Sequence, residues 1–139
     1  MVKKTKLPEN IGPIRKTDVR DALLTFSFRY FIHDNEVSPT EPPAGYLETL
    51  IGRLRDLSGW TVTEFVNPRS RSIRIHPIDW SETSRPKGFT HLPEQVRDGT
   101  AWQFGLTVNK YGRVHGLLVG GVFHVVWLDC NHQVYPMNA

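Results

Sequence analysis

Cysteine is nearly absent from this sequence, with Cys130 alone among 139 residues. A single cysteine can form no internal disulfide and cannot build a cysteine-based zinc site, so the sequence predicts a protein of a reducing compartment, the cytoplasm. No apolar run is long enough to span a membrane, so we expect no membrane partner. We also expect no secretory signal, because no apolar segment follows the basic residues at the start of the sequence.

Motifs for metals and common cofactors are missing as well. None of the six histidines forms a His-x₃-His helical pair, and Cys130-Asn131-His132 has no further cysteine partner. The sequence contains no phosphate-binding glycine loop, no dinucleotide fingerprint and no G-x-S-x-G nucleophile elbow. We therefore predict that the protein uses neither a metal nor a cofactor.

Charge and composition indicate an ordinary globular domain with a mildly basic surface. Hydrophobic residues make up 39% and charged residues 22%, and the net charge is +3. This balance is compatible with nucleic acid as a partner but does not indicate it. Residues 1–20 hold six basic groups and are predicted to form a flexible arm, and residues 21–139 to form one domain. The residues that we predict to contact nucleic acid are Arg69, Arg71, Arg74 and Lys110. The alternative for these basic groups is a solvated surface.

The stretch from Ala101 to Tyr135 carries the strongest pattern, with three strand-forming runs separated by two turn signals. Lys110-Tyr111-Gly112 predicts a three-residue hairpin loop with glycine in the left-handed conformation, and Gly120-Gly121 predicts a two-residue turn. These loops would set Thr107 opposite His115 in the first hairpin, and His115 opposite Val126 and Arg113 opposite Leu128 in the second.

This register divides the side chains of the three strands between two faces. The expected core face carries Trp102, Phe104, Leu106, Val108, Val114, Leu118, Phe123, Val125 and Trp127. The expected solvent face carries Gln103, Thr107, Asn109, Arg113, His115 and His124, mixed with Leu117, Val119, Val126 and Leu128. We therefore expect Phe123 and Trp127 to be buried and His124 to be less buried.

The first half of the sequence predicts one strand and two helices. Alternating apolar residues from Leu24 to Ile32 favour a strand, and an amphipathic helix is predicted from Tyr46 to near Ser58-Gly59. A capping box at Thr61–Glu64 starts a second short helix, and Ser72–Ile75 suits an edge strand because Pro77 follows it. The predicted fold class is α+β, an antiparallel sheet of four to five strands with two N-terminal-half helices packed on one face.

The best candidate for chemistry is a set of polar residues on the expected solvent face. Arg113, His115 and His124 would lie within about 5–8 Å of opposed or diagonal neighbours. An arginine can hold a phosphate, and a histidine can transfer protons near neutral pH. These groups suffice to cleave RNA without a metal. The alternative is a solvated sheet face with ordinary polar residues.

A family resemblance adds two further residues. The runs Arg113-Val114-His115, Val122–Trp127 and Asn131-His132-Gln133-Val134-Tyr135 resemble the C-terminal part of RelE-type toxins. The resemblance implies a small α+β endoribonuclease toxin that cuts ribosome-bound mRNA and is inhibited by an antitoxin. It also implies that Arg113, His132 and Tyr135 match the strand arginine and the terminal pair of that family. The resulting candidate catalytic set is Arg113, His115, His124, His132 and Tyr135.

Two other classes of function stay open at this point. One is a non-catalytic module that binds nucleic acid or a partner through its basic residues. The other is an adaptor of a bacterial or phage defence system with no chemistry of its own. The sequence departs from the toxin pattern in its length, in the proline-rich segment 38–45 and in the segment 69–99.

Overall fold

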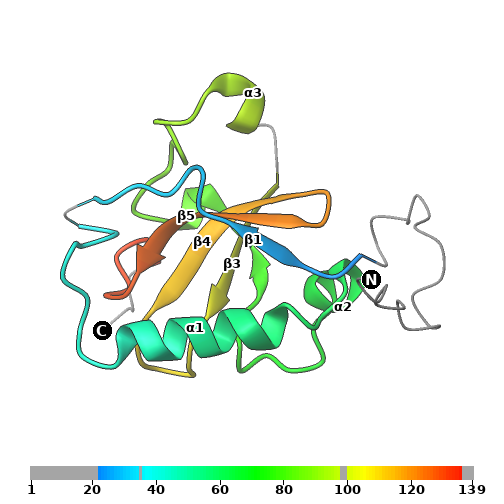
Figure 1. Cartoon of the computed structure of the whole chain (residues 1–139). Coiled ribbons are helices and arrows are strands. Elements are labelled where there is room, and N and C mark those ends of the chain that lie inside the picture. The colour runs from blue at the N-terminus through cyan, green and yellow to red at the C-terminus, as the bar shows by residue number, and fades with distance from the viewer. Residues whose placement is uncertain (1–21, 35, 98–99, 136–139) are drawn as a thin grey trace, which may run out of the picture.

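A five-stranded sheet with its two longest helices on one face forms the centre of the computed structural model, which describes residues 22–34, 36–97 and 100–135 (Figure 1). The strands are β1 (Thr25–Ser27), β2 (His76–Pro77), β3 (Thr100–Gly105), β4 (Arg113–Val119) and β5 (Val122–Asp129). The helices are α1 (Tyr46–Leu57), α2 (Val62–Val66), α3 (Glu94–Arg97) and the 3₁₀ turn η2 (Trp80–Glu82). The predicted α+β class is confirmed.

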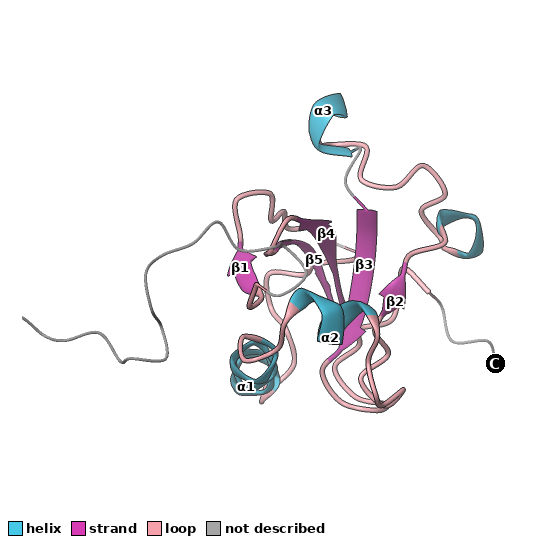
Figure 2. Ribbon diagram, turned by 90° about the vertical axis from the view of Figure 1, so that its right-hand side faces the viewer, coloured by secondary structure: helices cyan, strands magenta, loops and turns pink. Residues whose placement is uncertain are grey.

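The strand order is β1-β5-β4-β3-β2, so Figure 2 has β1 and β2 at the two edges. The pairs β2–β3, β3–β4 and β4–β5 are antiparallel, as predicted, whereas β1 pairs with β5 in parallel. The sheet is therefore mixed. A parallel neighbour needs a long crossover, and here it is the whole chain between β1 and β5.

Both predicted helices of the first half form where the sequence places them. α1 turns Tyr46, Leu50, Leu54 and Leu57 toward the sheet at helical spacing. The capping box that precedes α2 is complete, because the Thr61 hydroxyl accepts from the Glu64 N–H and the Glu64 carboxylate accepts from the Thr61 N–H. The predicted edge strand is shorter than expected and shifted to β2, next to the proline that limits it.

The helix-covered face of the sheet is the first of two cores. Phe104, Val114, Phe123 and Val125 are fully buried there against α1 and α2, which lie below the sheet in Figure 1. Phe65 of α2 packs edge-on against Phe104 and Phe123 at centroid distances of 6.2 and 5.8 Å. Aromatic rings prefer such edge-to-face packing, and the cluster fixes α2 on the sheet.

The opposite, loop-covered face is also a core, which corrects the prediction of a solvent face. Its buried apolar residues are Val37, Ile78, Phe89, Leu92, Leu117, Val126, Trp127 and Val134. They come partly from the strands and partly from irregular segments that cross the sheet above β4 and β5. No helical or strand periodicity marks these irregular segments, so the sequence pattern did not reveal a second layer.

A β-bulge explains why Trp127 lies on the loop-covered face. Gly116 pairs with Val125 but His115 pairs with Trp127, so Val126 is an extra residue in β5. Phe123 and Trp127 are both buried and His124 is less buried, as predicted, but Trp127 and Leu128 have exchanged faces relative to the expected register. The predicted pairs His115–Val126 and Arg113–Leu128 are wrong, and Arg113 pairs with Asp129 instead.

The first hairpin also differs from its predicted form. β3 ends at Gly105, so residues 106–112 connect it to β4 and His115 pairs with Gln103 rather than with Thr107. The partner of His115 thus changes from Thr107 to Gln103, a shift of an even number of residues along β3. Because side chains alternate between the two faces, the residues of β3 and β4 stay on their predicted faces. Val108 lies in this connection and is exposed, against the prediction of a core position. Gly112 does adopt the predicted left-handed conformation.

The predicted basic arm, residues 1–20, lies outside the described residues. Among the described helices, none is long and apolar enough to cross a membrane.

Candidate functional site

A row of side chains crosses the loop-covered face near the ends of the strands. His76 of β2 pairs with Gln103 of β3, Gln103 with His115 of β4, and His115 with Trp127 of β5. Gln103 and His115 are buried, which is unusual for polar side chains inside a sheet. In the next row, Arg113 pairs with Asp129. The strand pairing therefore brings charged and titratable residues from three strands together with the amide of Gln103 from β3.

The C-terminal segment folds over this row because a buried carboxylate holds it. Asp129 accepts hydrogen bonds from the backbone N–H groups of Gln133 and Val134, both at 2.8 Å. Burial raises the pKa of Asp129, while these two N–H groups lower it. The turn carries His132 and then Tyr135 back toward the sheet. The Tyr135 hydroxyl is fixed at the other side, where it accepts from the Asp79 N–H at 2.7 Å.

These elements enclose a cleft of about 290 Å³, which we call the phosphate cleft after the ligand that we propose for it below. Its lining residues are Arg74, His76, Gln103, Arg113, Asp129, His132 and Tyr135. Three of the five predicted catalytic residues, Arg113, His132 and Tyr135, therefore line one cleft. Arg74, predicted to bind nucleic acid, is the fourth predicted residue there.

Two arginines, Arg74 and Arg113, line the phosphate cleft. Burial lowers the pKa of Arg113, the nearby Arg74 lowers it further, and Asp129 opposes the shift. Two guanidinium groups in one cleft indicate an excess of positive charge, which a bound phosphate would neutralise. The Nη1 of Arg113 donates to the Gly112 carbonyl at 3.0 Å, which holds one terminal nitrogen of its guanidinium.

Two histidines supply groups that can transfer protons. The Nδ1 of His76 lies 2.8 Å from the Pro77 carbonyl, which can only accept, so Nδ1 carries the proton and Nε2 is left for a ligand. The Nε2 of His132 is buried and has no hydrogen-bond partner in the part of the chain that the structure describes. Burial, followed by the charge of Arg113, lowers the pKa of His132, so its ring is neutral near pH 7.

The backbone at the cleft adopts an uncommon conformation at two of these positions. Arg74 and His132 have φ angles of 58° and 55°, in the left-handed region that side chains other than glycine seldom occupy. Such angles cost about 1–3 kcal/mol each and are found most often at functional sites. Their presence on both sides of one cleft supports its assignment as the candidate functional site.

No family model, curated protein or solved structure matches the chain. The phosphate cleft must therefore be interpreted from its own residues, and the resemblance to RelE-type toxins stays a prediction. Among the residues that the structure describes, no group of three or more His, Cys, Asp or Glu side chains could hold a metal ion.

His115 is placed differently from its prediction as an exposed site residue. It has no exposed surface, and Tyr135 stacks on its ring at a centroid distance of 6.4 Å and an angle of 20°. Burial lowers its pKa to about 3, with Arg113, His76 and His132 acting in the same direction. Both ring nitrogens lack a partner within the described residues. A neutral, enclosed ring supports Tyr135 from below and cannot exchange protons with a ligand in the cleft.

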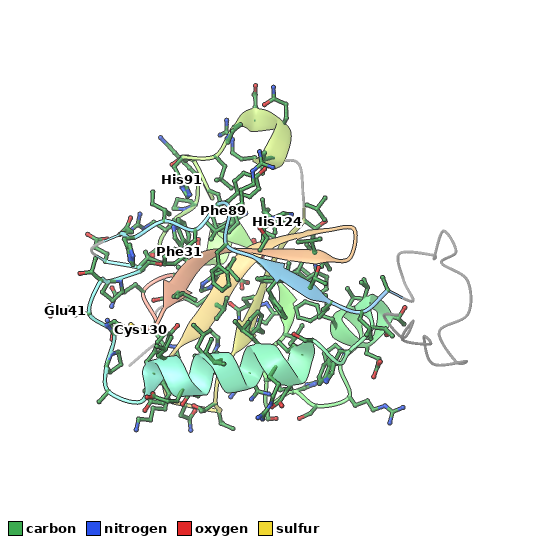
Figure 3. The ribbon with its side chains drawn as sticks, in the orientation of Figure 1. Phe31, Glu41, Phe89, His91, His124 and Cys130 are labelled. Atoms are coloured by element: carbon green, nitrogen blue, oxygen red, sulfur yellow. The ribbon has the colours of Figure 1, made fainter. Side chains whose placement is uncertain are left out.

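His124 does not join the site, because it lies near the other end of β5. It is five residues from Asp129, about 16 Å in an extended strand. Figure 3 places it well away from Cys130, which follows the end of β5 near α1. Its ring packs against Tyr30 at 5.3 Å, and burial and Arg29 lower its pKa. The shift of the register at the bulge does not change this separation.

The remaining predicted nucleic-acid contacts are spread around the molecule. Arg69 lines a separate pocket of about 300 Å³ beside α2, and Arg71 is exposed and does not line the cleft. Lys110 lies over the Tyr111 ring at 4.8 Å in the connection before β4. Their binding role stays a prediction.

Sequence reasoning missed His76, Gln103 and Asp129 as site residues. Only Gln103 could have been found from the sequence, because it is a polar residue in a mostly apolar strand. The prediction assigned it to the correct face of the sheet. His76 and Asp129 reach the cleft through the short edge strand and the bulge, neither of which leaves a periodic pattern.

Proposed function

We propose that the protein is a metal-independent endoribonuclease of the RelE-like type that cuts mRNA on the ribosome. The observation that carries the proposal is the phosphate cleft, in which Arg74 and Arg113 lie with His76 and His132. Two guanidinium groups bind and stabilise a phosphate whose charge grows in the transition state. Two imidazoles supply the base and the acid.

The reaction follows from these roles. The ribose 2′-hydroxyl attacks the neighbouring phosphorus, its proton passes to a base, the bond from phosphorus to the 5′ oxygen breaks, and an acid protonates that oxygen. His132 is the base in this scheme, because its lowered pKa keeps the ring neutral near pH 7. His76 is the acid, because its Nδ1 is fixed on Pro77 and its Nε2 can carry the second proton. Tyr135 shapes the cleft, since its hydroxyl is bound to Asp79.

The resemblance also implies an antitoxin partner, and α1 offers a surface for one. Leu47 and Ile51 are 62% and 55% exposed, and they lie one turn apart on the side of α1 that faces away from the core. An exposed apolar pair of this kind can bind the apolar face of an amphipathic partner segment. The double change Leu47→Glu and Ile51→Glu should prevent neutralisation by a partner without reducing RNA cleavage.

The test is RNA cleavage by the purified protein, with and without ribosomes, together with growth of a bacterial host during expression. We expect cleavage that continues in the presence of a chelator and products with 2′,3′-cyclic phosphate ends. Absence of cleavage in both conditions, with harmless expression, would contradict the enzyme. Binding of RNA without cleavage would then favour the second candidate, a non-catalytic nucleic-acid-binding module that uses the same two arginines.

A further inference from the structure

A second hollow on the loop-covered face lies on the far side of Trp127 from the phosphate cleft. It has a volume of about 430 Å³, and we call it the stacking pocket. The lining residues that matter here are Asp34, Arg85, Lys87, His91 and Trp127. Pockets for small ligands begin at about 300 Å³, so the hollow can hold a flat ring and its substituents.

The walls of the stacking pocket are aromatic and cationic. The His91 ring lies 6.1 Å from the Trp127 ring and is tilted by only 33°, whereas Phe89 and Trp80 meet Trp127 edge-on at 71° and 86°. His91 and Phe89 lie together on the side of the sheet away from α1 in Figure 3. Burial lowers the pKa of His91, so near pH 7 it presents a neutral ring face.

Arg85 forms a fixed, flat cation in the pocket. Its guanidinium carbon lies 5.7 Å from the Trp127 ring centre. Asp34 and Glu36 hold its nitrogens at 3.0–3.3 Å. An arginine that is already paired with two carboxylates has little need of a phosphate, but its plane can still stack on a ring. The exposed Lys87 at the rim adds a charge that suits a nucleic-acid backbone.

The stacking pocket and the phosphate cleft are neighbours on the same face. The backbone N–H of Ser84, a residue of the stacking pocket, donates to the Val134 carbonyl, next to Tyr135 of the cleft. Trp127 and Tyr135 both contact the buried ring of His115, at 6.5 and 6.4 Å. The segment Gln133–Tyr135 and the rings of His115 and Trp127 therefore link the two sites.

We propose that the stacking pocket binds a nucleobase of the same single-stranded RNA whose phosphate occupies the phosphate cleft. This inference rests on the proposed function. It specifies the substrate as single-stranded RNA with one unstacked base next to the phosphate that is cleaved. Single-stranded RNA is recognised by stacking of unpaired bases on aromatic and arginine planes. Because every base has such a face, the pocket selects single-strandedness rather than a sequence.

The test is binding of a six-nucleotide RNA that carries a fluorescent label and 2′-O-methyl groups, so that it cannot be cleaved through its 2′ oxygen. Loss of one base stack costs about 1–3 kcal/mol, and we expect His91→Ala to raise the Kd by about fivefold or more. His33→Ala is the matched control, because His33 is an exposed histidine outside both sites. Lys87→Glu, at the exposed rim, should also raise the Kd and serves as a second variant if His91→Ala does not fold.

An abasic nucleotide placed in turn at each position identifies the base that stacks. At one position it should weaken binding to the wild type and cause no further loss in His91→Ala. Equal affinity of His91→Ala and His33→Ala, or no binding of the RNA to the wild type, would overturn the stacking pocket. Binding that depends on His91, with no cleavage of unmodified RNA, would overturn the enzyme and leave the stacking pocket in place.

Discussion

The two faces of the sheet are both buried, yet they are built in different ways. The helix-covered face is closed by α1 and α2, and its buried cluster is apolar apart from the Tyr46 hydroxyl and Cys130. The loop-covered face is closed by irregular segments and the C-terminal turn, and it buries Gln103, His115 and Asp129 with its apolar residues. The comparison shows that regular elements cover an apolar face. The irregular segments cover the polar groups that the strands place on the other face, and they leave hollows beside them.

This difference predicts that substitutions on the two faces have different consequences. A change on the helix-covered face should reduce stability and leave the activity of each folded molecule unchanged. A change at the phosphate cleft should reduce activity and leave stability unchanged.

The largest expected effect belongs to His132. His132→Asn should lower the rate of RNA cleavage by about 10²–10⁴, the usual contribution of a proton-transferring group. Asparagine tolerates the left-handed backbone at this position, so the variant should melt at nearly the wild-type temperature. The wild-type kcat/KM should fall as the pH drops through a value below 6.5, because the base must be neutral and its pKa is lowered. His124→Gln is the matched control and should cleave RNA at the wild-type rate. Equal losses in both variants would contradict the separation of the two histidines.

The two cores should contribute similarly to stability. Phe123→Ala on the helix-covered face and Trp127→Ala on the loop-covered face should each lower the free energy of unfolding by about 3–5 kcal/mol in denaturant titrations. Only Trp127→Ala should also weaken RNA binding, because Trp127 lines the stacking pocket. A cost near zero for Trp127→Ala would show that the irregular segments do not form a core.

Arg113 should affect the rate more than any surface cation. Arg113→Ala should lower cleavage by about 10²–10³, as expected when one group that stabilises transition-state charge is lost. Lys110→Ala provides a comparison within the same hairpin, and it should change the rate by less than about threefold because it lies outside the cleft. If the lysine variant lost as much activity as the arginine variant, general attraction of RNA would explain both results.

His115 should make the loop-covered face sensitive to acid. Its pKa is about 3 in the folded protein and about 6.5 in the unfolded chain, so the unfolded state alone binds a proton between these values. Stability should therefore fall as the pH decreases from about 6.5, by about 2 kcal/mol at pH 5 relative to pH 7. His115→Leu should remove this part of the pH dependence, which chemical denaturation at the two pH values can measure. An unchanged dependence in the variant would assign the effect to other groups.

The sequence predicted the helix-covered face well because that face depends on periodicity. The spacing of Tyr46, Leu50 and Leu54 and the capping box at Thr61 are local signals, and both helices form at these positions. The prediction failed where a single residue changes the phase. The bulge at Val126 turns Trp127 to the other side, and nothing in the alternation of β5 marks it.

The candidate site was predicted only in part for the same reason. Arg113 lies at a strand start that the sequence indicates, and His132 was named from the family resemblance. His76 and Asp129 reach the cleft through long-range pairings that no local pattern encodes. His115 was expected on a solvent-exposed face. It is buried because irregular segments, which no periodic pattern marks, cover that face of the sheet.

The bulge in β5 has a consequence for how the length of this chain can change. Val126 is the extra residue between Val125 and Trp127, and its carbonyl accepts a hydrogen bond from the Ile32 N–H, which attaches the irregular layer to the sheet. Deletion of this one residue would make the ladder regular and leave Trp127 opposite His115 and Asp129 opposite Arg113, but it would remove the carbonyl that holds Ile32. A homologous chain could therefore lose this codon and keep the strand pairing of the site, while losing one attachment of the layer that covers it.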